Sequence, residues 1–216
     1  MKNVLFIKSS EFFREPRAEK AVNFLANNYN VKVLCWDRDG SAQKFEKKVN
    51  YEIHRCHIKG MYGGGLKNFS TLLLWWSYCF FWLLREPFAL VHACDFDSYL
   101  PSLFAAKLKR KKIIYDMFDF YSDMIKLPTF IKNAVKNIDL FMVQFADGLI
   151  LTDENRINQI AGSNPKKWIA IYNTPPDFYE KFKKNVENKD NSKFTFGFIG
   201  LIEDNKCNIL IDLVSE

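Results

Sequence analysis

The sequence lacks paired cysteines, a strong excess of charge of either sign, and a hydrophobic run long enough to span a bilayer. Its five cysteines form no CxxC pair and mostly lie in apolar runs. This excludes a disulfide framework or zinc site and indicates a reducing compartment. The net charge of +6 comes from scattered lysines, so nucleic acid is not indicated as a partner. The chain starts directly with a strand-like run and no signal peptide, so we expect it in the cytoplasm.

The longest uncharged run covers residues 69–84, FSTLLLWWSYCFFWLL. It is shorter than the roughly 20 residues that cross a bilayer. Two interpretations remain open. The run forms a helix buried in the core, or it lies peripherally on a membrane with Trp75, Trp76, Tyr78 and Trp82 at the headgroup level. Because an indole N–H group needs a partner, the tryptophans slightly favour the membrane surface.

Apolar runs alternate with helical stretches along most of the chain, and a composition of 48% apolar and 26% charged residues is typical of globular proteins. Strands separated by helices predict βαβ units and a parallel sheet. We therefore predict an α/β fold for residues 1–180, a Rossmann-like doubly wound parallel sheet of about seven strands. The predicted strands cover residues 4–7, 31–36, 51–58, 89–93, 112–115, 148–151 and 168–172.

The character of the chain changes after these strands. Residues 173–177 are rich in turn formers, and residues 181–193 are polar and read as a linker. Residues 194–216 then begin a new strand and helix. One βα pair cannot bury a core of its own. We therefore expect this last segment to be the start of a second domain, and the chain to be part of a two-domain protein.

The loop after the first strand, residues 9–14, contains no glycine. Both the dinucleotide fingerprint and the P-loop need glycines at this position, because the backbone must approach the phosphates closely. Classical NAD binding and P-loop ATP hydrolysis are therefore set aside.

Four carboxylates follow two predicted strands that we expect to be neighbours: Asp95, Asp97, Asp116 and Asp119. Ligands of open α/β sheets bind at the carboxyl ends of strands. Three interpretations remain open. The carboxylates cap helices, they bind sugar hydroxyls or act as a general base, or the pair Asp95 and Asp97 binds a divalent metal.

Three further side chains are candidates at the same edge. Arg14 and Arg17 flank the start of the first helix, where guanidinium groups suit phosphate or carboxylate, although both also fit an ordinary solvated surface. His92 lies at a strand end among apolar residues and is either a core histidine or a site residue.

Short segments along the whole chain resemble family 4 glycosyltransferases of the GT-B fold, in the correct order. They are EPRAEKA at 15–21, VKVLCWDR at 31–38, LVHACD at 90–95, IYDMFD at 114–119, ILTD at 150–153, IYN at 171–173 and FGFIG at 196–200.

The resemblance implies an acceptor-binding N-terminal domain, a second domain that binds a nucleotide sugar, and transfer with retention of configuration. It implies no metal and no cofactor, because the nucleotide sugar is a substrate. We assign catalysis to Asp116 and Asp119. Acceptor binding is assigned to Arg14, Arg17, His92 and Asp95, and donor binding to Gly200 and Lys206.

Three positions depart from the family pattern. Phe118 stands where the family often has a histidine that contacts the donor sugar, Leu201 replaces an arginine, and Cys207 replaces the glycine after Lys206. The acidic motif that grips the donor would lie beyond residue 216, so we expect this chain alone to be inactive. Residues 69–84 suggest a lipid-linked or cell-envelope glycan as acceptor. The alternatives are a non-catalytic Rossmann-like binding module and a metal-dependent transferase that uses Asp95 and Asp97.

Overall fold

The computed structural model describes residues 1–61, 68–124 and 127–174, apart from the side chain of Arg14. The chain divides into two compact units, Met1–Asn173 and Thr174–Glu216. The predicted linker at 181–193 and the predicted second βα unit at 194–216 lie outside the described residues.

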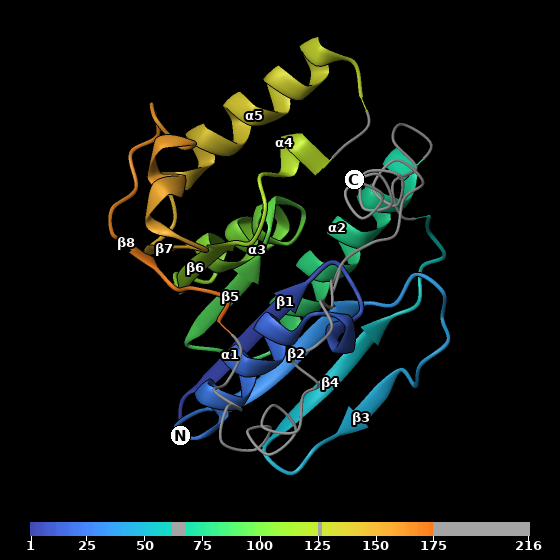
Figure 1. Ribbon diagram of the computed structural model, residues 1–216. Helices are drawn as coiled ribbons and strands as arrows, with labels where there is room; N and C mark the ends of the chain where they lie inside the picture. The colour runs from blue at the N-terminus through green and yellow to red at the C-terminus, as the bar shows by residue number, and fades with distance from the viewer. Residues whose placement is uncertain (62–67, 125–126, 175–216) are drawn as a thin grey trace, which may run out of the picture. The chain divides into compact units, whose positions relative to one another are not determined.

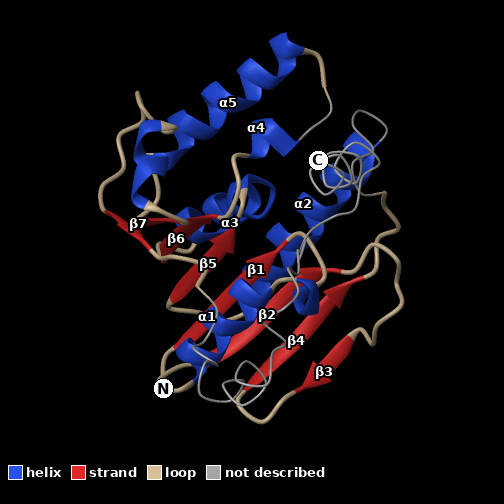
Figure 2. Cartoon of the chain, in the orientation of Figure 1, coloured by secondary structure: helices blue, strands red, loops and turns tan. Residues whose placement is uncertain are grey.

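The first unit is built on one eight-stranded sheet of order β3-β4-β2-β1-β5-β6-β7-β8 (Figures 1 and 2). The seven strands β1, β2 and β4 to β8 are parallel, which confirms the predicted Rossmann-like α/β class. The parallel strands are β1 (Asn3–Lys8), β2 (Asn30–Trp36), β4 (Tyr51–Cys56), β5 (Leu90–Cys94), β6 (Lys112–Met117), β7 (Gly148–Leu151) and β8 (Trp168–Ala170).

The eighth strand, β3 (Phe45–Lys47), pairs antiparallel with β4 at one edge of the sheet, and the sequence did not predict it. Its three residues are too few to show the alternation that marks a half-buried strand. Short edge strands with charged side chains are a common way to protect a sheet from pairing with another chain.

Helices cover both faces of the sheet (Figure 1). Alternate residues of β1 point to opposite faces. Phe6 packs with the apolar side of α1 (Pro16–Ala26), whereas Leu5 and Ile7 belong to the core formed with α2 (Phe69–Arg85) and α3 (Phe96–Leu108). The remaining helices among the described residues are η1 (Phe12–Arg14), α4 (Tyr121–Met124), α5 (Thr129–Val143) and η3 (Glu154–Asn158).

The position of Trp75 in α2 contradicts the expectation that it lies at the headgroup level of a membrane. Trp75 is fully buried and stacks on Trp36, with ring centroids 5.6 Å apart. Its indole Nε1 donates to the backbone oxygen of Asp97 at 3.2 Å, and Trp76 donates to the same oxygen at 2.9 Å. The placement of Trp75 at a headgroup level is therefore wrong, because the first turn of α3 supplies the acceptor that the indole needs.

The other two aromatic residues of that prediction differ from each other. Trp82 is partly buried and packs against the core, whereas Tyr78 is exposed. Among the described residues, no helix, α2 included, combines the length and apolar character needed to cross a bilayer.

Candidate functional site at the carboxyl edge of the sheet

The predicted site residues gather where β1, β5 and β6 end. β1 pairs with β2 on one side and with β5 on the other, and β5 pairs with β6. The chain winds in opposite directions from β1, so the topological switch point of this sheet lies between β1 and β5. Such a position is where ligands of open α/β sheets bind.

Lys8, the last residue of β1, bridges this switch point. Its Nζ donates to Oδ2 of Asp95 at 2.6 Å, and both side chains are buried. Burial, the largest single effect, would lower the pKa of Lys8, but the charge of Asp95, the hydrogen bond to it and the charge of Glu15 together with that of Cys94 outweigh burial and raise the pKa above its ordinary value. The other oxygen of Asp95, Oδ1, accepts from the backbone N–H groups of Phe118 at 3.0 Å and Asp119 at 3.3 Å.

The backbone of Asp95 is strained. Its φ of 60° and ψ of 162° fall in a region that is populated almost only by glycine, at a cost of about 1–3 kcal/mol. The ion pair with Lys8 and a backbone hydrogen bond from Asp95 N to Asp116 O at 2.9 Å hold the residue in this conformation. Asp95 is the N-cap residue of α3, but its side chain makes no capping hydrogen bond to the helix. Its carboxylate instead accepts from Lys8 and from the backbone N–H groups of the loop after β6.

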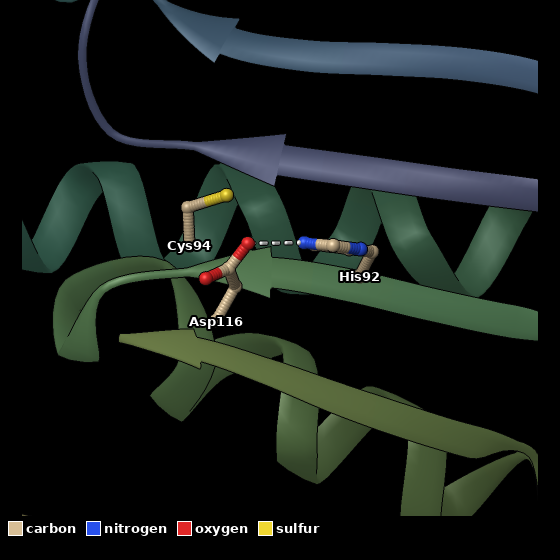
Figure 3. A group of neighbouring side chains, drawn as sticks. All are labelled: His92, Cys94 and Asp116. Atoms are coloured by element: carbon tan, nitrogen blue, oxygen red, sulfur yellow. Dashed lines mark hydrogen bonds and ion pairs between the residues drawn. The ribbon is translucent and has the colours of Figure 1, made fainter. Parts of the chain in front are cut away.

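Asp116, near the end of β6, is the second buried carboxylate of the site. Its Oδ1 accepts from Arg17 at 2.8 Å, and its Oδ2 lies 2.9 Å from Nε2 of His92 (Figure 3). Because a carboxylate paired with arginine accepts hydrogen bonds, His92 donates from Nε2. Arg17 also donates to the backbone oxygen of Ile171 at 2.8 Å, so it joins α1 to β6 and to the segment after β8.

His92, Cys94 and Asp116 also form a candidate metal-binding group (Figure 3). Their ligand atoms lie within 4.8 Å of one another. However, burial and the neighbouring Asp116 charge raise the pKa of Cys94 well above its ordinary value, which favours the thiol over the thiolate that metals bind. Both oxygens of Asp116 are already paired with protein donors, so the group is best described as a hydrogen-bonded part of the core.

A divalent metal bound by Asp95 and Asp97 is also disfavoured. Both oxygens of Asp95 accept from protein donors, one of them a lysine ammonium group that would repel a cation. Asp97 lies inside the first turn of α3 rather than before it, so the interpretation that its carboxylate caps this helix is wrong.

Asp97 is a buried acid whose environment the sequence did not reveal. Burial, with the charge of Asp95 adding to it, raises its pKa to about 6. Its Oδ1 is enclosed and finds no hydrogen-bond partner among the described residues. The carboxyl group therefore takes up a proton far more readily than an exposed aspartate.

Asp119 differs from the other carboxylates because its side chain is 58% exposed. Its Oδ1 accepts from Nη2 of Arg156 at 3.2 Å. The other terminal nitrogen of Arg156, Nη1, donates to the backbone oxygen of Phe118 at 2.8 Å. The ring of Phe118 contacts two cations of the site, with Nζ of Lys8 at 4.2 Å and the guanidinium of Arg17 at 4.8 Å from its centroid. A phenylalanine here covers the buried ion pairs.

The structure thus brings most of the predicted site residues together. The charged network of the site consists of two adjoining buried groups, Arg17 and His92 on Asp116 and the ion pair of Asp95 with Lys8, and Asp119 lies at its exposed rim. The side chain of Arg14 and the predicted donor residues Gly200 and Lys206 lie outside what the structure describes.

The sequence analysis missed two partners of this network, Lys8 and Arg156. The signal for Lys8 was a single charge at the end of an otherwise apolar strand. Arg156 has no such signal, because its partners are 37 and 38 residues away in the chain.

No protein-family model matches the chain, and no curated protein matches its sequence. Solved structures do match its fold. A sucrose-phosphate synthase structure from Thermosynechococcus elongatus aligns with a TM-score of 0.59 at 11% identity and covers 85% of this chain and 96% of that one.

Two further structures contain this fold within a longer chain. UGT89C1 of Arabidopsis thaliana, complexed with UDP-L-rhamnose, aligns with a TM-score of 0.56 at 13% identity over 91% of this chain. UDP-N-acetylglucosamine 2-epimerase from Rickettsia bellii aligns with a TM-score of 0.53 at 14% identity over 88% of this chain. The present chain spans 58% and 50% of their lengths, respectively. These likenesses show the fold, a Rossmann-like α/β domain with a mostly parallel sheet.

Proposed function

We propose that this chain is the acceptor-binding lobe of a retaining glycosyltransferase, similar to family 4, that moves a sugar from a nucleotide sugar to a lipid-linked or cell-envelope glycan. The observation that carries the proposal is the charged network at the switch point of a GT-B-type lobe, where Lys8 and Asp95 join β1 to β5. Of the similar folds, one is a structure complexed with UDP-L-rhamnose and another is named a UDP-N-acetylglucosamine 2-epimerase.

Within this proposal the carboxylates have different roles. Asp119 is exposed at the rim and is the group that can contact an acceptor hydroxyl directly. Asp116 is buried between Arg17 and His92, so it acts by holding the edge of β6 and the loop that follows it in place. Asp95 positions the same loop through the backbone N–H groups of Phe118 and Asp119.

The donor side of the reaction belongs to a second lobe, to which we assign Gly200 and Lys206. Transfer from a nucleotide sugar depends on positioning the two substrates and on stabilising the charge of the departing diphosphate. In this proposal the nucleotide sugar is a substrate, and no cofactor or metal takes part. The first lobe alone would bind an acceptor without transferring a sugar to it.

The test uses the full-length product of the native gene and follows release of nucleoside diphosphate from a panel of nucleotide sugars, with membrane glycolipids as acceptors. We expect Asp119→Asn to lower kcat/KM by about 100-fold, since general acid–base groups typically contribute 10²–10⁴-fold. Asp123→Asn, an exposed aspartate in the nearby α4, is the matched control and should leave the rate within about twofold of wild type.

An alternative is a non-catalytic Rossmann-like binding module. It is favoured by the ion pairs of Asp95 with Lys8 and of Asp116 with Arg17, because both carboxylates already have partners within the protein. Binding of a glycan without turnover of any nucleotide sugar by the full-length protein would support this alternative and contradict the transferase.

A further inference from the structure

The outward side of α2 is largely apolar, with only Ser70 and Ser77 as exposed polar residues between Phe69 and Leu84, although it faces away from the core. Its exposed side chains lie along one stripe of the helix, while Trp75, Cys79 and Leu83 on the opposite side are fully buried. No charged residue interrupts either side between residues 69 and 84. A helix that is hydrophobic all round normally has a partner on each side. The exposed large side chains are Phe69, Leu73, Leu74, Tyr78 and Phe81.

The neighbouring helix α3 extends this surface. α2 and α3 pack side by side, with Sγ of Cys79 lying 3.8 Å from Oγ of Ser102. Phe104 and Leu108, one turn apart on α3, are 55% and 67% exposed. We call these two residues and the five exposed side chains of α2 the α2–α3 surface.

Positive charge gathers at one end of this surface. Lys109, just after α3, donates from Nζ to the backbone oxygens of Leu83, Leu84 and Glu86, so the carboxyl ends of α2 and α3 meet there. Several exposed basic residues lie at this junction. Of the acidic residues beside them, Glu86 is paired with Lys32, and Asp147 accepts from the backbone N–H of Ile113 and lies 3.9 Å from Nζ of Lys166. The basic cluster consists of Arg85, Lys107, Arg110, Lys111 and Lys112.

We propose that the α2–α3 surface and its basic cluster dock on an anionic lipid bilayer. Aromatic and aliphatic side chains on a helix that lies in the interface enter the boundary between headgroups and acyl chains, and adjacent Lys and Arg side chains bind lipid phosphates. The charge favours this occupant over a second copy of the chain, because a symmetric dimer would bring the same positive cluster to both sides of its interface.

This docking surface does not depend on the proposed sugar transfer, because vesicle binding and turnover are measured separately. If both proposals hold, the lobe would meet a lipid-linked acceptor at the membrane surface. The surface also corrects the earlier choice of contact residues, because the exposed side chains Leu74 and Phe81, rather than the buried Trp75, face outward.

The test is co-sedimentation of the intact chain with vesicles of phosphatidylcholine alone or with 30% phosphatidylglycerol. We expect binding to the anionic vesicles, at least tenfold weaker binding to neutral vesicles, and weaker anionic binding as salt is added. Replacing three exposed lysines, Lys107→Gln, Lys111→Gln and Lys112→Gln, should lower the affinity by roughly 100-fold, at about fivefold for each charge.

The apolar part is tested with Leu74→Ser plus Phe81→Ser, which should abolish binding without unfolding the protein, because both side chains are exposed. Matched controls are Phe24→Ser, an exposed phenylalanine of α1, and Lys44→Gln plus Lys47→Gln at the β3 edge. Both controls should bind like wild type.

Three results would overturn the proposal. The first is equal binding to neutral and anionic vesicles, and the second is binding that the Leu74 and Phe81 changes leave intact. The third is a concentration-dependent dimer, seen by light scattering, that is lost on Phe81→Ser while no vesicle binding occurs. That outcome would make the α2–α3 surface an interface between two copies of this chain.

Discussion

The ammonium group of Lys8 and the carboxylate of Asp95 form a buried ion pair of 2.6 Å between two neighbouring parallel strands, although 87 residues separate them in the chain. The pair crosses the sheet at its switch point and also fixes a strained backbone conformation at Asp95. It therefore links the stability of the lobe to the geometry of the candidate site.

Removing one partner of this pair should be costly. We expect Lys8→Met to lower the free energy of unfolding by about 3–5 kcal/mol, because it leaves the Asp95 carboxylate buried without its cation. The double variant with Asp95→Asn should be less destabilised than the sum of the two single variants, by at least about 1 kcal/mol. Urea unfolding followed by circular dichroism measures both effects, and strict additivity would show that the pair is not coupled.

Arg17 should be more important than its position on a surface helix suggests. Arg17→Met removes the partner of Asp116 and the bond to the Ile171 oxygen, so we expect a loss of about 3 kcal/mol. Lys20→Met, one turn along α1, removes an exposed hydrogen bond to Asn173 and should cost less than about 1 kcal/mol. Equal losses in the two variants, measured by urea unfolding, would contradict the structural role of Arg17.

Asp139 predicts a pH dependence of stability. Burial raises its pKa from 3.8 to about 7, although the hydroxyl of Tyr115, which donates to Oδ1 at 2.9 Å, opposes the shift. The folded state therefore binds more protons than the unfolded state between these values. The contribution of Asp139 to the free energy of unfolding is complete below about pH 4 and is lost as the pH rises to about 7. Between pH 5 and pH 7 the free energy of unfolding therefore falls by about 2 kcal/mol from this group.

The variant Asp139→Asn tests this assignment through urea unfolding at pH 5 and pH 7. Its stability should fall less steeply with pH than that of wild type. Some slope should remain, because the raised pKa of Asp97, about 6, acts in the same direction. An unchanged slope would mean that Asp139 does not titrate in this range.

The thiols of the first lobe should react slowly. Burial raises the pKa values of Cys35, Cys56 and Cys79 to about 12 and that of Cys94 well above its ordinary value. In a Cys207→Ser background we expect less than one thiol to react with Ellman's reagent within minutes at pH 8, and four after unfolding in urea. Rapid reaction of a thiol in the folded protein would show that its strand is locally open.

The sheet could be predicted from sequence because most of its parallel strands are short apolar runs between turn formers or helical stretches; β4, with Glu52, His54 and Arg55, is the more polar exception. The clustering of Asp95 and Asp116 followed from the rule that parallel strands end at one edge. The charge state of the site could not be predicted, because the partners of these carboxylates, Lys8 and Arg17, are 87 and 99 residues away. The same limit applies to Trp75, whose buried indole is satisfied by a backbone oxygen 22 residues along the chain.

The hydrogen bond from Arg17 to the oxygen of Ile171 spans 154 residues. On a ribosome that adds about 5–20 residues per second, its two ends emerge on the order of ten seconds apart. Throughout that interval α1 can dock on β2, yet the guanidinium group has no final acceptor and the candidate site stays unfinished. Folding of this lobe during translation is therefore completed only when the segment after β8 has emerged, and a nascent chain stalled before residue 171 would expose an unfinished edge to chaperones and proteases.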